Sequence, residues 1–215
     1  MGLIRWLKGE EPSIVEKISF MAKHDFDKGA YGEYLTEYLF GNENIEGYSR
    51  TLHNIYVPYR GKTSEIDVLL IHEKGIFVFE SKNYSGWIFG SDEQQQWTQM
   101  LNKQTKNRFY NPIKQNATHI NALSQYLKID KSAMKSFIVF SERCELKKVP
   151  DDTPEYTILQ RHHLLRELRR DIQNRYVIFT SQDVDAITNM LIPLTNVSES
   201  TKQSHIDNIN RTVRK

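Results

Sequence analysis

Three strand-like runs in close succession limit the folds open to this chain more than any other part of its sequence. They are RTLHNIYVPY (50–59), EIDVLLIH (65–72) and GIFVFESK (75–82). The link between the second and third runs is short enough for a hairpin, and Gly75 can adopt the positive φ that such a turn needs. Four consecutive large apolar residues in the third run are typical of a strand covered on both faces. The pattern predicts a meander inside a layered fold.

Helical patterns precede and follow these strands. The clearest is NPIKQNATHINALSQYL (111–127), where Asn111 is suited to cap the helix and Pro112 to occupy its first position. Its expected buried stripe is Ile113, Ala117, Ile120, Leu123 and Leu127. We also expect helices over 12–24, 30–40, 162–172 and 181–192, a small hairpin within 86–101, and strands over 135–141 and 155–159. This order predicts an α/β fold with a mixed central sheet flanked by helices.

Composition excludes some classes of protein. The chain has 215 residues and one cysteine, Cys144, which excludes an internal disulfide and a metal site built from cysteines. No apolar stretch approaches the roughly 20 residues that span a bilayer, and the first residues contain too short an apolar run for a signal peptide. We therefore expect a reduced cytoplasmic location and no membrane partner.

Charge is unevenly distributed although the net charge is only +2. Residues 94–129 contain no Asp or Glu. They do contain basic and aromatic side chains, namely Lys103, Lys106, Arg108, Lys114, Lys128, Trp97, Phe109, Tyr110 and Tyr126. Such a segment suits a polyphosphate strand, and a solvated basic face explains it equally well.

Charged residues end the most apolar strand. Alternation places Glu80 and Lys82 on the face of Val78, and Asp67 on the matching face of the preceding strand. Buried carboxylates require partners, and Mg²⁺ prefers hard oxygen ligands. Asp67 and Glu80 could hold Mg²⁺ together with the Ser81 carbonyl, while Lys82 positions or deprotonates a water or stabilises charge on phosphorus. An Asp67–Lys82 ion pair, with Glu80 solvated at the strand end, explains the same pattern.

Several motifs occur in an order typical of one known family. They are GAYGE (29–33), SEIDVLLI (64–71), GIFVFESKNYSGWIFG (75–90), Trp97 and NPIKQ (111–115). In these motifs the chain resembles the NERD (nuclease-related domain) family, a branch of the PD-(D/E)xK nuclease superfamily. The resemblance implies a restriction-endonuclease-like core over 29–195, preceded by a helical lead-in over 1–28 and followed by a polar tail over 196–215.

The resemblance also implies roles for individual residues. Asp67 and Glu80 would be metal ligands and Lys82 the catalytic lysine. Glu33 would be a secondary ligand or would organise water, and Gln115 would reach the site from its helix. Superfamily branches with this glutamine often carry tyrosine four residues later, where this chain has His119.

The implied activity is hydrolysis of phosphodiester bonds, usually in DNA, with Mg²⁺ or with Mn²⁺ in its place. DNA would be held mainly through its phosphates, and a homodimer would pair two active sites. A non-catalytic nucleic-acid-binding or adaptor module on the same fold is the alternative function, and a scaffold with ordinary ion pairs at the strand ends is a third.

Overall fold

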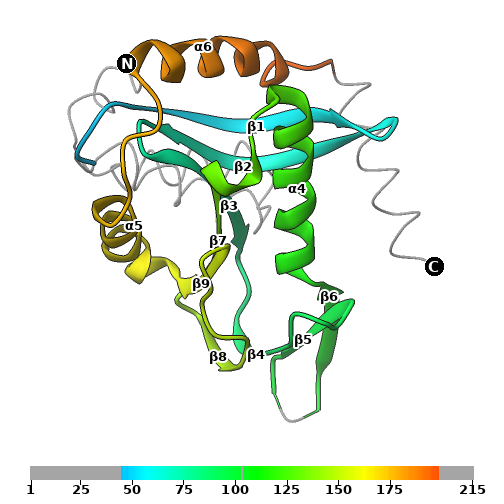
Figure 1. Ribbon diagram of the computed structural model, residues 1–215. Coiled ribbons are helices and arrows are strands. Elements are labelled where there is room, and N and C mark those ends of the chain that lie inside the picture. The colour runs from blue at the N-terminus through cyan, green and yellow to red at the C-terminus, as the bar shows by residue number, and fades with distance from the viewer. Residues whose placement is uncertain (1–44, 103, 199–215) are drawn as a thin grey trace, which may run out of the picture.

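A five-stranded mixed sheet forms the centre of the computed structural model, which describes residues 45–102 and 104–198 (Figure 1). Its strands are β1 (Ser49–Tyr59), β2 (Lys62–His72), β3 (Gly75–Lys82), β7 (Met134–Phe140) and β9 (Tyr156–Gln160), in the order β1-β2-β3-β7-β9. The first three strands form the predicted antiparallel meander, and Gly75 has a φ of 144° in its tight turn. β7 and β9 continue the sheet in parallel to β3.

Helices cover both faces of this sheet. α4 (Pro112–Leu127) and α6 (Ser181–Leu191) share a core with Ile76 and Val78 of β3. α5 (Leu164–Gln173) packs with Phe77 and Phe79 on the other face. Short 3₁₀ turns, η1 (Lys131–Ala133), η2 (Arg161–His163) and η3 (Ile192–Leu194), connect or extend these elements. Burial of β3 on both faces explains its continuous apolar run and confirms the prediction.

A second, smaller sheet lies beyond the first turn of α4 (Figure 1). It has the order β6-β5-β4-β8, from β6 (Lys106–Tyr110), β5 (Gln96–Met100), β4 (Gly86–Phe89) and β8 (Cys144–Lys148). The β4–β5 hairpin was expected, whereas β6 and β8 were not. Trp97 is fully buried and lies parallel to the Phe140 ring, with centroids 6.2 Å apart. This contact joins the small sheet to the central one.

The structure confirms a mixed α/β fold with a central sheet between helices. The helices expected over 12–24 and 30–40 lie outside the described residues, as does almost all of the tail expected from 196. Among the helices that the structure describes, none is long and apolar enough to cross a membrane.

Candidate active site

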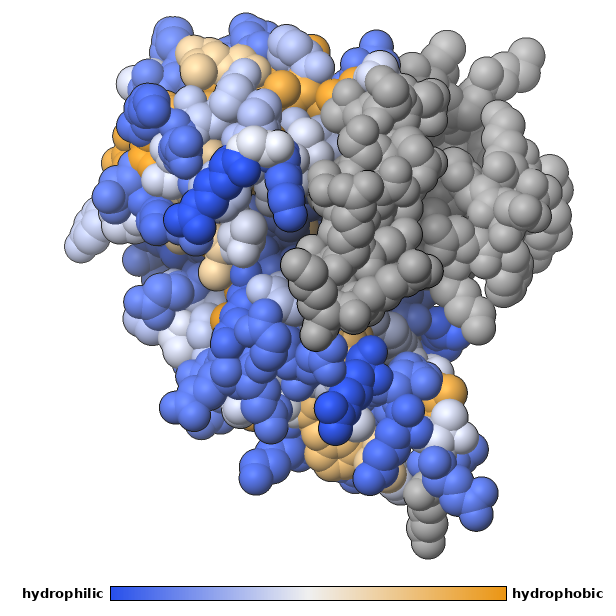
Figure 2. All heavy atoms as spheres, turned by 90° about the vertical axis from the view of Figure 1, so that its right-hand side faces the viewer, coloured by the Kyte–Doolittle hydropathy of each residue, from blue (hydrophilic) through white to orange (hydrophobic). Residues whose placement is uncertain are grey.

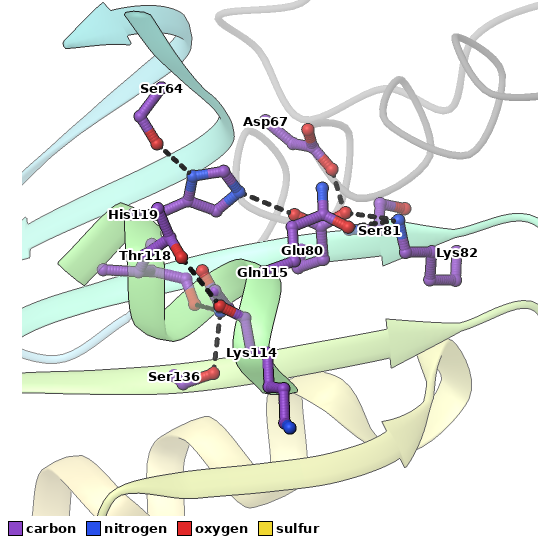
Figure 3. A network of polar contacts seen from close by, with 12 residues as sticks. Ser64, Asp67, Glu80, Ser81, Lys82, Lys114, Gln115, Thr118, His119 and Ser136 are labelled. Atoms are coloured by element: carbon purple, nitrogen blue, oxygen red, sulfur yellow. Dashed lines mark hydrogen bonds and ion pairs between the residues drawn. The ribbon is translucent and has the colours of Figure 1, made fainter. Parts of the chain in front are cut away.

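The antiparallel ladder between β2 and β3 brings two carboxylates together. Its last pair is Val68 and Phe79, and one further step along the same register sets Asp67 opposite Glu80. The Ser81 N–H donates a hydrogen bond to Asp67 Oδ2 at 2.8 Å (Figure 3). The Asp67 carboxylate is thereby fixed against the backbone that follows Glu80.

The strand geometry is irregular at Asp67. The β1–β2 ladder pairs the residues on either side of Asn54 and Asp67 but omits these two. Asn54 has a φ of 51°, a left-handed conformation that asparagine tolerates better than most residues. Ile66 and Leu69, three residues apart, belong to the same core cluster. The regular alternation that we used to orient Asp67 therefore does not run through this position, and its carboxylate points to the end of β3 instead.

Glu80 is buried and ionised. It is 2% exposed, which excludes the arrangement in which this residue is solvated at the strand end. Lys82 Nζ lies 2.6 Å from Glu80 Oε1, and His119 Nε2 lies 3.0 Å from Glu80 Oε2. Burial disfavours the charged carboxylate, but the Lys82 ammonium and the hydrogen bond from His119 outweigh it and hold the pKa of Glu80 below its ordinary value.

Lys82 is charged for the same reason. Burial opposes its charge, but the carboxylates of Glu80 and Asp67 outweigh this effect and raise the pKa of Lys82. Its ammonium also donates to Gln115 Oε1 at 3.0 Å. Lys82 is therefore held as a cation between β3 and α4. Gln115 reaches this site from α4, as expected.

α4 is positioned by polar contacts on its buried face. As predicted, the Asn111 side chain caps the helix and Pro112 occupies its first turn. Asn116 is fully buried and donates through Nδ2 to Val78 O at 2.9 Å and to Ser136 Oγ at 2.7 Å. His119 is also buried, and its Nδ1 lies 2.7 Å from Ser64 Oγ. These contacts fix both the depth and the rotation of the helix.

The expected apolar stripe of α4 is wrong in part. Ala117 is exposed, and Ile113 and Ile120 are only half-buried, whereas Leu123 and Leu127 are buried as expected. The helix is rotated towards Asn116 and His119 because groups on β3 and β7 bind the Asn116 amide nitrogen and the His119 ring.

The oxygen atoms at this site suit a divalent cation. Two carboxylates at adjacent strand positions match the hard ligands that Mg²⁺ takes, and the residue whose N–H binds Asp67, Ser81, also has a carbonyl oxygen to offer. Each carboxylate oxygen has two lone pairs, so Glu80 can bind a cation without losing Lys82 or His119. Among the described residues, no group of three His, Cys, Asp or Glu side chains is arranged to hold a metal. Water or other ligands would have to complete the coordination.

Five of the residues predicted for the site lie together in the structure. Asp67, Glu80, Ser81, Lys82 and Gln115 come together, and Glu33 lies outside the described residues. The sequence pattern assigned no role to His119 or to its partner Ser64. His119 lies four residues after Gln115, a spacing that places two side chains on one helix face. This spacing was the sequence signal that could have identified His119 as a site residue.

Comparison with known proteins agrees with the sequence motifs. The nuclease-related domain family matches residues 28–141. An uncharacterized protein of Bacillus anthracis is 32% identical over 183 residues, which cover 83% of this chain and 82% of that protein. No solved structure matches the chain significantly.

Proposed function

Because the chain belongs to the nuclease-related domain family, we propose that it is a Mg²⁺-dependent nuclease that hydrolyses phosphodiester bonds in DNA. The observation that carries the proposal is the buried, ionised carboxylate of Glu80 between Lys82 and His119, one register step from Asp67. A buried ion pair is weak evidence for stability, because desolvation offsets much of its attraction. Its position at the end of the most apolar strand is better explained by chemistry.

Asp67, Glu80 and the Ser81 carbonyl would hold the cation, with Glu33 as a secondary ligand or water-organising residue. When bound, Mg²⁺ would supply Lewis-acid chemistry, which activates the attacking water and balances the negative charge of the phosphate. The water oxygen would form a bond to phosphorus while the bond to one ester oxygen breaks. The products are a phosphate monoester and a free hydroxyl.

The other residues act on position and charge. Lys82 is a cation, so it would donate hydrogen bonds to the attacking water or to a phosphate oxygen rather than accept a proton. Gln115 would orient the Lys82 ammonium through their 3.0 Å contact. His119 would orient the Glu80 carboxylate, because it holds the oxygen that Lys82 does not.

A cleavage assay tests the proposal. Purified protein is incubated with linear, circular and single-stranded DNA in Mg²⁺, Mn²⁺ or EDTA, beside Glu80→Gln and Lys82→Ala. Lys131→Ala, at an exposed position, is the matched control. We expect metal-dependent cleavage that both site variants reduce by on the order of 100-fold or more.

Two results would contradict the nuclease proposal. Cleavage that persists in both site variants would identify a contaminating enzyme. Binding of DNA by the wild-type protein without cleavage in either metal would favour the non-catalytic adaptor instead.

A further inference from the structure

The small sheet has two unlike faces. Its inner face carries Ile88, Trp97 and Phe109, which pack against the central sheet through Phe140. Cross-strand pairs share a face, and the register pairs Trp87 with Met100 and Met100 with Lys106. It likewise pairs Phe89 with Thr98 and Thr98 with Arg108. We call the opposite side the outer face, formed by Trp87, Phe89, Gln96, Thr98, Met100, Lys106, Arg108, Tyr110, Glu145, Lys147 and Lys148.

The outer face exposes aromatic rings to solvent. Tyr110 is 36% exposed, and Trp87 and Phe89 are only half-buried. An antiparallel sheet normally turns polar residues to water, so a group of aromatic residues on that side is informative. In Figure 2 the lower part of the molecule shows an apolar patch among strongly hydrophilic side chains. Because these three side chains are partly exposed, a planar ligand could stack on their rings.

Cations border these rings. The four strands of the small sheet carry four basic side chains, Lys106, Arg108, Lys147 and Lys148, and one acidic side chain, Glu145. Glu145 is paired with Lys147 at 2.5 Å, and the Lys147 ammonium also lies 5.7 Å from the centroid of the Trp87 ring. The remaining positive charge complements an anionic backbone.

Two strands of the small sheet, β4 and β6, begin or end close to the candidate active site. Gly86, the first residue of β4, comes four positions after Lys82, and its N–H donates to Arg143 O at 3.1 Å. The exposed Arg143 guanidinium donates to the carbonyl and the side-chain oxygen of Asn83, the residue after Lys82. β6 in turn ends immediately before the cap of α4, the helix that carries Gln115. A strand of nucleic acid could therefore pass from Lys82 past Arg143 onto β4.

We propose that the outer face binds single-stranded DNA next to the cleaved bond, with bases stacked on Trp87, Phe89 and Tyr110 and phosphates contacted by Lys106 and Arg108. The proposal extends the nuclease function and rests on it. Single strands fit best because a duplex hides the faces of its bases, whereas an unpaired base can stack on an aromatic ring. Basic residues on edge strand β6 also discourage pairing with other chains, but that role does not require the aromatic residues of β4.

Fluorescence anisotropy with a labelled oligothymidylate tests this proposal in EDTA, where metal-dependent cleavage cannot occur. We expect Trp87→Ala to weaken binding by about 5- to 50-fold, the loss of one base stack. Trp87→Phe should keep most of the affinity but lose the quenching of tryptophan fluorescence that stacking causes. Tyr176→Ala, at an aromatic position that is 90% exposed elsewhere, should bind like the wild type.

A salt titration tests the electrostatic part of the proposal. Arg108→Ala should lower the slope of log affinity against log salt concentration by about 0.7, the value for one phosphate contact on a single strand. Arg166→Ala, at a side chain that is 70% exposed on α5, is the control and should leave the slope unchanged. Circular dichroism and thermal melting would establish that each variant is folded.

The outcomes separate the two proposals. Unchanged binding by folded Trp87→Ala and Arg108→Ala would overturn the stacking surface and leave the nuclease proposal intact. Equal affinity of the wild type for duplex DNA, or no affinity for oligothymidylate, would also overturn it. If the variants lose binding but the wild type cleaves no DNA in Mg²⁺, the surface stands as a binding site and the nuclease proposal fails.

Discussion

His119 Nε2 lies 3.0 Å from Glu80 Oε2, while Lys82 holds the other oxygen of the same carboxylate. A neutral ring that donates from Nε2 must accept at Nδ1, and Ser64 Oγ lies 2.7 Å from that atom. The chain Ser64–His119–Glu80 thus links three elements, β2, α4 and β3. It fixes the carboxylate more firmly than the Lys82 ion pair could alone.

Removal of His119 should weaken metal binding. His119→Ala leaves Glu80 Oε2 without this hydrogen bond, and loss of such outer partners typically lowers metal affinity by about 10- to 100-fold. His119→Gln should recover part of the affinity, since its amide can donate. Titration of Mn²⁺ followed by calorimetry measures the effect. Thr118→Ala, on the same turn of α4, is the control. If His119→Ala binds Mn²⁺ as tightly as Thr118→Ala does, the role assigned to His119 is contradicted.

Gln115 should affect turnover and not metal affinity. Its contact is with the Lys82 ammonium and not with either carboxylate. Gln115→Ala should lower kcat by about 10-fold, because Lys82 loses orientation, while Mn²⁺ binds as in the wild type. The same assays on Ala117→Ser, at an exposed position of α4, provide the baseline. Equal losses of kcat and Mn²⁺ affinity in Gln115→Ala would show that the residue supports the carboxylates instead.

The sequence predicted the central strands well because their apolar runs and turns are local signals. The cap and first turn of α4 were predicted for the same reason. The buried face of α4 was not predicted correctly, because Asn116 and His119 are polar residues whose partners come from distant strands. β6 was missed because KNRFY is mostly charged or polar, and only pairing with β5 makes it a strand. Partners that are distant in the sequence determine these features, and local sequence periodicity carries no information about such partners.

The stability of the protein should fall in mild acid through His53. Burial lowers the pKa of His53 to about 4, from an ordinary value near 6.5. Between these values the unfolded chain binds a proton that the folded chain does not. The stability that the folded protein owes to a neutral His53 is therefore fully present above pH 6.5 and is lost as the pH falls towards 4. The free energy of unfolding can be measured with urea at each pH. Between about pH 7 and 5 it should fall by about 2 kcal/mol more in the wild type than in His53→Gln.

Gln125→Ala, at an exposed position of α4 that does not titrate, is the control for this prediction and should keep the wild-type pH dependence. If His53→Gln keeps it as well, the acid sensitivity of the protein comes from other groups.

Cys144 should be unreactive in the folded protein. It is 3% exposed, its S–H donates to Ser141 O at 3.2 Å, and burial raises the pKa of the thiol to about 11. At about pH 8 a disulfide reagent such as dithionitrobenzoate should therefore label no thiol until the protein is unfolded. Ser132→Cys, at an exposed site, should react at once and acts as the positive control. Rapid labelling of folded wild-type protein would contradict the packing between β7 and β8.

The proposed nuclease function requires Asp67 and Glu80 to share a divalent cation beside Lys82. Anomalous diffraction from crystals soaked in millimolar Mn²⁺ measures this directly. We expect a strong anomalous peak within coordination distance of both carboxylates and the Ser81 carbonyl, absent in Glu80→Gln. A wild-type crystal with no peak there, and with Glu80 still bound only by Lys82 and His119, would contradict it.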